Sequence, residues 1–189
     1  MAEIIQVGEV GNILGPIPYS EAHPADKNQP GIRHITVNGL IYKDKSKQEF
    51  LCQQRGKNVQ AGKYNLDISF GGHVFWETYE RNKRNLKNTV DSTVESTVRD
   101  ELFSGDNLPP ELKLGLLWKG PKQTKPSDPE YVFLYEGIYP GPFNPNRTSG
   151  QVINVRFRSV DEVLTDMEEN PTRYTRTLGF HLRRIRGSE

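Results

Sequence analysis

The sequence has little cysteine and no excess of charge of either sign. Cys52 is the only cysteine among 189 residues, which excludes an internal disulfide and a cysteine-based zinc site. The 25 Lys and Arg residues are matched by 24 Asp and Glu residues, so the net charge is +1. No global field therefore favours binding to nucleic acid or to a membrane surface, and neither is an expected partner.

Long hydrophobic runs are also absent. No stretch approaches the roughly 18 apolar residues that a membrane span needs, and the opening MAEIIQVGEV lacks the basic and apolar segments of a secretory signal. The chain nevertheless carries 8 Phe, 8 Tyr and 2 Trp residues, too many aromatic side chains for a disordered protein. These features predict one soluble, cytoplasmic globular domain over residues 1–189.

Runs of β-branched and aromatic residues predict most of the strands. They occur at residues 32–42, 49–55, 66–76, 112–118, 131–139 and 152–158, bounded by turn-forming residues. In the second of these strands Phe50 and Cys52 alternate with Leu51 and Gln53. Phe50 and Cys52 therefore share one face, and Cys52 is expected to be a small core residue rather than a reactive thiol.

Three helices are predicted, one of them long. Apolar residues recur every four positions at Leu86, Val90, Val94, Val98 and Leu102, which predicts a helix over residues 86–103 with one buried face. Ser104-Gly105 is a typical left-handed stop. A capping box at Ser159–Glu162 starts a second helix that runs to about Glu169, and apolar spacing after Pro171 predicts a terminal helix. The fold class is mixed α/β, with helices covering both faces of a sheet.

Two segments resemble a known family. The stretch QQRGKNVQAGKYNLDISFGGHV resembles the approach to the Nudix box of Nudix hydrolases, in the branch that resembles isopentenyl-diphosphate isomerase. The segment VGEVGNILGPIPYSEAH resembles the opening of that branch, a short hairpin with a closing histidine. The resemblance covers nearly the whole chain. It implies a Nudix-like α/β/α sandwich with a mixed sheet and an N-terminal β-hairpin.

The family's working motif is G-x5-E-x7-R-E-U-x-E-E-x-G-U, where U is aliphatic. Its glutamates hold Mg²⁺ or Mn²⁺ against a substrate diphosphate, because hard divalent cations need several carboxylate oxygens from one helix face. Counting from Gly72, Thr78 stands where the first glutamate is expected and Glu77 comes one residue early. An insertion around residues 78–89 then separates this position from the helix.

The helical part of the motif is degenerate. In the best alignment Glu101 matches the first helix glutamate, while Ser104 and Gly105 occupy the positions of the two metal-binding glutamates. A shift by one residue places Phe103 and Ser104 there instead, so neither alignment restores the carboxylates. Only Glu101 remains, and binding of Mg²⁺ or Mn²⁺ is expected to be weak or absent.

The resemblance implies a set of carboxylates for the reaction. It gives Glu101 and Glu130 catalytic roles, and it makes Glu101 and Glu77 the metal ligands. Glu130 directly precedes a predicted strand, at a place where relatives of this branch carry a functional glutamate. The alternative for Glu130 is a solvated carboxylate at the strand end, after Pro129.

The resemblance also implies a ligand pocket. Its residues are Arg55, Lys57, Gly71, Gly72, His73 and Trp76. Arginine can bind phosphate oxygens with two parallel hydrogen bonds, and glycine allows close approach of a ligand to the backbone. The alternatives are a solvated strand end for the two cations, a structural His73, and packing for Trp76.

The inserted segment is basic. It carries Arg81, Lys83, Arg84 and Lys87, which form either a solvated cluster or a clamp over an anionic ligand. His23 and His34 are isolated in the sequence and receive no metal role. The isomerase cysteine would lie between Ser69 and His73, where this chain has none, so isomerase activity is not expected.

Two functions from different classes remain open. The first is a metal-dependent hydrolase of a diphosphate-containing, nucleotide-like ligand, with an impaired metal site. The second is a catalytically inactive Nudix-fold module that binds a ligand or regulates a partner. Fold does not decide between them. The expected partner is a small phosphorylated molecule, and a homodimer is one arrangement that the sequence leaves open.

Overall fold

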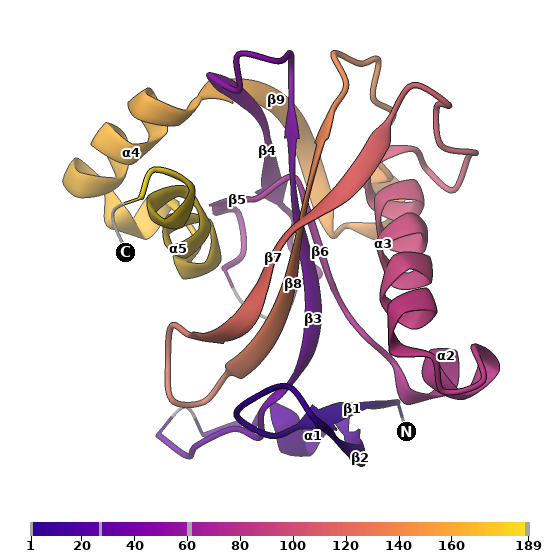
Figure 1. The fold of residues 1–189 in the computed structure, drawn as a ribbon. Coiled ribbons are helices and arrows are strands. Elements are labelled where there is room, and N and C mark those ends of the chain that lie inside the picture. Colours follow the sequence, from indigo (N-terminus) through magenta and orange to yellow (C-terminus); the bar gives the residue numbers. More distant parts are fainter. Residues whose placement is uncertain (1, 27, 60–61, 188–189) are drawn as a thin grey trace. The chain divides into compact units, whose positions relative to one another are not determined.

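The computed structural model describes residues 2–26, 28–59 and 62–187. Figure 1 shows its strands and helices. In chain order they are β1 (Glu3–Val7), β2 (Ile13–Pro18), α1 (Tyr19–Ala22), β3 (His34–Tyr42), β4 (Glu49–Arg55), β5 (Leu66–Asp67), β6 (Phe70–His73), α2 (Trp76–Arg81), α3 (Leu86–Leu102), β7 (Lys113–Gln123), β8 (Pro129–Ile138), β9 (Val152–Ser159), α4 (Val160–Glu169) and α5 (Arg176–Ile185). Short 3-10 turns occupy Arg147–Ser149 and Pro171–Arg173.

Backbone hydrogen bonds join the strands in a mixed sheet. The pairing order is β2-β1-β3-β4-β5, while β6 and β8 also pair with β3, β7 pairs with β8, and β9 pairs with β4. The antiparallel pair β1–β2 is the predicted N-terminal hairpin. The mixed α/β fold expected from the sequence is therefore confirmed. Among the described helices, none is long and apolar enough to cross a membrane.

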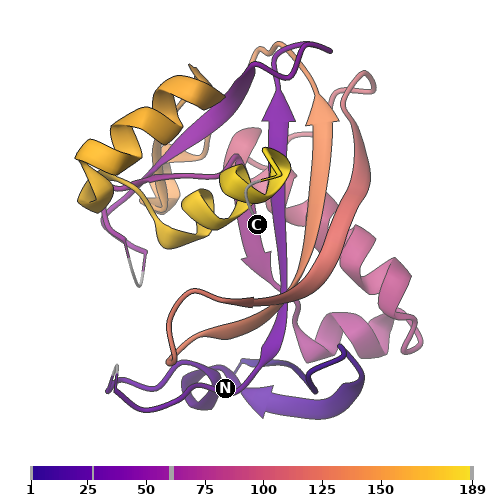
Figure 2. The same cartoon turned by 60° about the vertical axis from the view of Figure 1, so that its left-hand side comes forward.

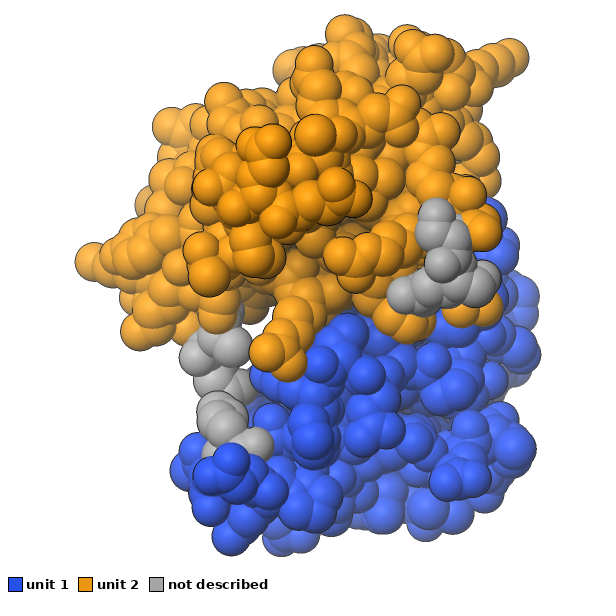
Figure 3. Space-filling view, turned by 90° about the vertical axis from the view of Figure 1, so that its left-hand side faces the viewer, with its two compact units in different colours: residues 1–38, 71–95, 116–135 blue, residues 39–70, 96–115, 136–189 orange. Residues whose placement is uncertain are grey.

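Contacts within the chain group into two compact units, which Figure 3 colours separately. Unit 1 comprises Met1–Asn38, Gly71–Glu95 and Leu116–Tyr135. Unit 2 comprises Gly39–Phe70, Ser96–Gly115 and Glu136–Glu189. The strand β3 and the helix α3 contribute residues to both units.

The core of unit 2 lies between β-strands and the two C-terminal helices. Figure 2 shows α4 and α5 side by side. Their apolar residues pack with those of β4 and β5; the buried set is Leu40, Tyr42, Phe50, Cys52, Leu66, Ile68, Val160, Val163, Met167, Tyr174, Leu178 and Leu182. Cys52 is 1% exposed, and burial raises the pKa of its thiol to about 12. The expectation of a core cysteine is confirmed.

Side-chain caps fix where the two C-terminal helices begin. The Ser159 hydroxyl accepts a hydrogen bond from the Glu162 N–H, as the capping box predicts. The Thr175 hydroxyl accepts from the Leu178 N–H in the same way. The terminal helix therefore begins at Arg176 rather than directly after Pro171, because Tyr174 is still extended at the end of a 3-10 turn.

The long helix α3 has the predicted buried face. Val90, Val94, Val98 and Leu102 are at most 3% exposed, and Leu86 is half-buried. The helix ends at Leu102. Ser104 and Gly105 follow with φ values of 51° and 86°, in the left-handed region that stops a helix. The two positions aligned with the Nudix glutamates thus lie beyond the helix.

The region from Leu66 to Arg81 differs from its prediction. The single strand expected at residues 66–76 is two short strands, β5 and β6, separated by Ile68-Ser69. Trp76 then begins α2, so the inserted segment starts as a helix. The sequence WETYER lacks apolar periodicity; instead Glu77 pairs with Arg81, one turn later. Such pairs support a solvated helix without the hydrophobic pattern on which the prediction relied.

Candidate metal centre

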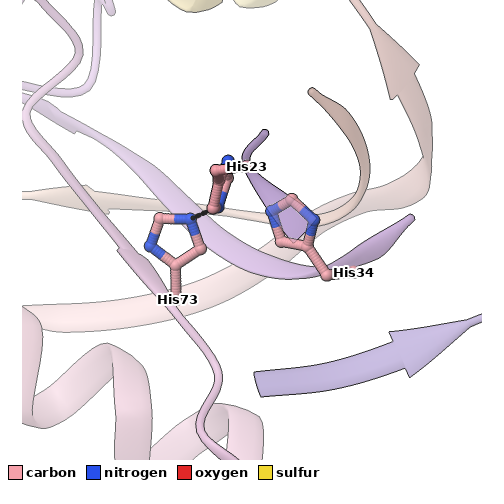
Figure 4. A group of neighbouring side chains, drawn as sticks. All are labelled: His23, His34 and His73. Carbon is pink, nitrogen blue, oxygen red and sulfur yellow. Dashed lines mark hydrogen bonds between the residues drawn. The ribbon is translucent and has the colours of Figure 1, made fainter. Parts of the chain in front are cut away.

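Three histidines from distant parts of the sequence meet in unit 1, as Figure 4 shows. His23 follows α1, His34 begins β3 and His73 ends β6. The Nε2 atoms of His23 and His73 are 3.0 Å apart. The His34 ring centroid lies 4.5 Å from that of His23 and 5.3 Å from that of His73. His23 and His34, which are isolated in the sequence and received no metal role from it, are therefore brought together by the fold.

Two carboxylates at the start of β8 belong to the same cluster. Asp128 Oδ1 lies 3.2 Å from His23 Nδ1 and 3.9 Å from His34 Nε2. In the described part of the chain, the ligand atoms of the three histidines lie within 4.8 Å of one another, and so do those of His34, Asp128 and Glu130. Imidazole nitrogens combined with carboxylate oxygens are ligands for zinc and related divalent metals.

Hydrogen bonding orients His34 as a metal ligand. Its Nδ1 is 2.9 Å from the carbonyl oxygen of Ile32, which can only accept, so Nδ1 carries the proton and Nε2 keeps its lone pair. Among the described residues, this buried Nε2 has no hydrogen-bond partner. Buried polar atoms are normally satisfied. A divalent cation would satisfy His34 Nε2, so these residues fit a metal ion.

The ionisation states also suit a metal. Burial lowers the pKa of His34 to about 4 and that of His73 to about 3. Burial opposes ionisation of Asp128, but the adjacent His23 and Lys125 outweigh it and hold the pKa of Asp128 below its usual range. At neutral pH the two imidazoles are neutral and the carboxyl group is ionised, and these are the forms that bind metal ions.

Glu130 is buried rather than solvated. It is 8% exposed and forms an ion pair with Lys122, which is itself 2% exposed. Burial raises the pKa of Glu130, while the Lys122 ammonium favours the ionised form. The alternative of a solvated carboxylate at the strand end is wrong. This pair could not be predicted locally, because Lys122 lies within a run of glycine, proline and lysine that is typical of an exposed segment.

Glu101 does not belong to either group of potential metal ligands in the described part of the chain. It is half-buried near the end of α3 in unit 2, where it accepts a hydrogen bond from Gln53 Nε2 at 3.3 Å. Where three or more potential ligands gather among the described residues, neither Glu101 nor Glu77 takes part. The Glu77 side chain is 83% exposed. The metal roles implied for these two glutamates remain predictions.

The basic insertion is largely paired with acids one helical turn away. Arg81 contacts Glu77, Arg84 contacts Glu80 and Lys87 contacts Asp91. These side chains are exposed or nearly so. The arrangement favours the solvated cluster over a clamp. Beside it, the rings of Trp76 and Tyr79 lie 5.2 Å apart.

The Arg55 side chain is held in place by the buried carboxylate of Asp67. Its Nη1 donates to Asp67 Oδ2 at 2.6 Å, and Asp67 is 4% exposed. The other carboxylate oxygen accepts from the Ile68 N–H at 2.9 Å and from the Thr175 hydroxyl. Arg55 remains partly exposed. An arginine side chain is suited to binding the oxygens of an anion.

The other predicted ligand residues are distributed over both units. Lys57 is exposed in the turn after β4, in unit 2 with Arg55. Gly71 and Gly72 are half-buried in β6, and they belong with His73 and Trp76 to unit 1. His73 is the member of the predicted pocket that the structure places in the histidine cluster.

Comparison with known proteins identifies relatives by fold. No family model and no curated protein matches the chain. The crystal structure of DR0079 from Deinococcus radiodurans is similar at a TM-score of 0.70 with 16% identity, over 96% of this chain and 98% of that one. A Nudix hydrolase from Alicyclobacillus acidocaldarius has a TM-score of 0.57 with 11% identity, over 78% and 88%. An Ap4A hydrolase from C. elegans has a TM-score of 0.50 with 11% identity, over 80% and 96%.

Proposed function

We propose that this chain, whose fold is that of the Nudix hydrolases, binds a divalent metal ion through His23, His34 and His73, with Asp128 beside them, and acts on a diphosphate-containing ligand. One observation carries the metal site: His34 Nε2 is buried without a hydrogen-bond partner in the described chain, and it lies in a group with His23 and His73 whose ligand atoms are within 4.8 Å of one another. The ligand class is supported by the fold, which is shared with an enzyme described as an Ap4A hydrolase.

When bound, a metal ion supplies a Lewis acid that polarises a phosphoryl oxygen and lowers the pKa of a bound water. The chain's own residues have separate tasks. The Ile32 carbonyl holds His34 in the tautomer that presents Nε2. Arg55, which is oriented by Asp67, is a proposed ligand-binding residue, because a guanidinium suits phosphate oxygens. Lys57, Gly71, Gly72 and Trp76 are proposed ligand-binding residues, and Glu101 and Glu130 are proposed catalytic ones.

The metal site is tested by replacing the carboxylate that faces two histidines. Calorimetric titration of the metal-stripped protein with Zn²⁺ is expected to give one ion per chain. Asp128→Asn should raise Kd by about tenfold or more, because it removes the negative charge that faces His23 and His34 while preserving shape. The matched control Asp106→Asn changes an exposed turn residue and should leave Kd unchanged. Failure of the parent protein to bind, or equal binding by both variants, contradicts the proposal.

Ordinary Nudix turnover with Mg²⁺ is expected to be weak. The helix α3 offers Glu101 alone, since Ser104 and Gly105 lie beyond its end in left-handed conformations. One carboxylate completed by water binds Mg²⁺ poorly. A screen of dinucleotides, nucleotide sugars and nucleoside triphosphates should therefore give little cleavage with Mg²⁺ or Mn²⁺. Rapid cleavage with Mg²⁺ would mean that carboxylates from elsewhere complete a Nudix site.

The second candidate function is a binding module without catalysis. The C-terminal end of α3 favours this candidate. Ser104 and Gly105 occupy the aligned positions of the two metal-binding glutamates, and both lie beyond the helix. The screen above separates the candidates when it is paired with binding assays. Nucleotide binding without cleavage, under any of the metals tested, identifies a binding module. Cleavage that requires Zn²⁺ or Mn²⁺ and is lost in Asp128→Asn identifies a metal-dependent hydrolase.

A further inference from the structure

A cavity of about 400 Å³ lies in unit 2, where the strand β9 leads into the helix α4. Its polar lining includes Gln48, Glu49, Arg156, Arg158 and Glu162. This volume is within the range of pockets that hold small molecules. None of these residues belongs to the histidine cluster of unit 1 or to the ligand pocket that the resemblance implies. The cavity is therefore a separate candidate site.

Strand pairing explains why two arginines lie on the same side of the sheet. In the antiparallel pair of β4 and β9, Arg156 lies opposite Cys52, and Arg158 lies opposite Phe50. Directly opposite residues share a face of the sheet. The residues opposite the two arginines pack in the core together with α4 and α5. Both arginines therefore project from the face that carries these helices, about 7 Å apart along the strand.

Arg158 has a buried donor without a partner. Its side chain is half-buried, and its buried Nε has no hydrogen-bond partner in the described chain. Arg156 is exposed, and among the described residues no ion pair includes either arginine. Buried donors are normally satisfied by the protein or by ordered water. Because a guanidinium is always charged and only donates, an anion is the group best suited to satisfy Arg158.

The carboxylates of the cavity do not cancel the charge of the two arginines. Glu49 Oε2 lies 2.6 Å from the Lys43 ammonium, so its charge is already matched. Glu162 is exposed in the first turn of α4, where solvent screens its charge. The cavity therefore keeps an excess of positive charge.

We propose that this cavity binds a small oxyanion, a phosphate or carboxylate group, between Arg156 and Arg158. A guanidinium matches the oxygens of either group with two parallel hydrogen bonds. Two arginines on one face of a strand hold the same anion from two sides, and the anion satisfies the buried Nε of Arg158. The site needs neither the metal ion nor Arg55, so it does not rest on the function proposed above.

The test follows the backbone amide signals of Gln48 and Glu162 by NMR while inorganic phosphate or succinate is added to the full chain. Both signals should shift until they saturate, and the probe that binds more tightly identifies the class of oxyanion. Arg158→Met should raise the Kd read from these signals by about tenfold or more, because hydrogen bonds to a charged group are lost. The control Arg183→Met removes an exposed arginine of α5 and should leave this Kd unchanged.

A second variant keeps the proposal testable if Arg158→Met does not fold. Arg156 is exposed, so Arg156→Met should fold like the parent protein and should also raise Kd by about tenfold. Equal Kd values in the parent protein and in either of these variants, once folded, would overturn the proposal. So would the absence of any phosphate-induced or succinate-induced shift at Gln48 and Glu162.

Titration of Arg55→Met separates this cavity from the diphosphate site proposed above. The shifts at Gln48 and Glu162 should persist in Arg55→Met, because Arg55 does not line the cavity. If Arg55→Met abolishes these shifts, the cavity is rejected as a separate site. If Arg158→Met abolishes them and Arg55→Met does not, the cavity stands whether or not the proposed diphosphate site is correct.

Discussion

Val98→Asp is expected to leave little folded protein, with the free energy of unfolding lowered by about 4 kcal/mol or more. Val98 is fully buried on the apolar face of α3. The substitution buries a carboxylate where the parent protein has an apolar side chain. Protonation would remove the charge, but at neutral pH it still costs several kcal/mol. Chemical denaturation followed by circular dichroism measures the loss.

The control for this variant is Ser92→Asp on the exposed side of the same helix. It introduces the same side chain at a solvated position and should change the free energy of unfolding by less than about 0.5 kcal/mol. If Val98→Asp unfolded at the same denaturant concentration as the parent protein, the buried face assigned to α3 would be incorrect.

Asp67→Ala is expected to lower the free energy of unfolding by about 3 kcal/mol. Asp67 receives three donors in the described structure, from Arg55, Ile68 N–H and the Thr175 hydroxyl. Removing the carboxylate breaks the ion pair of a partly buried guanidinium while leaving the positive charge in place, which is costlier than removing both groups together. Denaturation of the variant gives the loss, and Asp106→Ala in an exposed turn serves as the matched control.

A double-mutant cycle with Arg55→Met separates the ion pair from the rest of the network. Once Arg55 is absent, Asp67→Ala should cost at least about 1 kcal/mol less than it does in the parent protein. Inorganic pyrophosphate binding should weaken in Asp67→Ala as well as in Arg55→Met, because the guanidinium loses its fixed orientation. A pyrophosphate affinity unchanged in both variants would remove Arg55 from the ligand site.

The fold was largely predictable because its elements carry strong local patterns. The four-residue spacing of valines along α3, the capping box at Ser159 and the β-branched run of β3 each fix one element without help from the rest of the chain. The helix α2 was missed for the opposite reason. Its stability comes from pairs such as Glu77–Arg81 rather than from a buried stripe, and apolar periodicity does not register such a helix.

The candidate metal centre could not be predicted from spacing. His23, His34 and His73 are separated by 11 residues or more in the sequence and have no common local motif. What joins them is sheet pairing, which brings the start of β3 and the end of β6 together in unit 1. Asp128 and Glu130 are two residues apart, and this spacing was the local signal that could have drawn attention to both.

The hydrogen bonds of Thr175 connect the C-terminal helix α5 to the strand β5, so the C-terminal region is not independent of that strand. Its hydroxyl caps α5 by accepting from the Leu178 N–H and also donates to Asp67, while its backbone N–H bonds to Leu66 O at 2.9 Å. A chain shortened before residue 175 would therefore lose more than a helix. It would also lose one of the donors that hold Asp67, and through Asp67 the support of an arginine 120 positions earlier. Truncation at this end is therefore expected to alter the orientation of the Arg55 side chain as well.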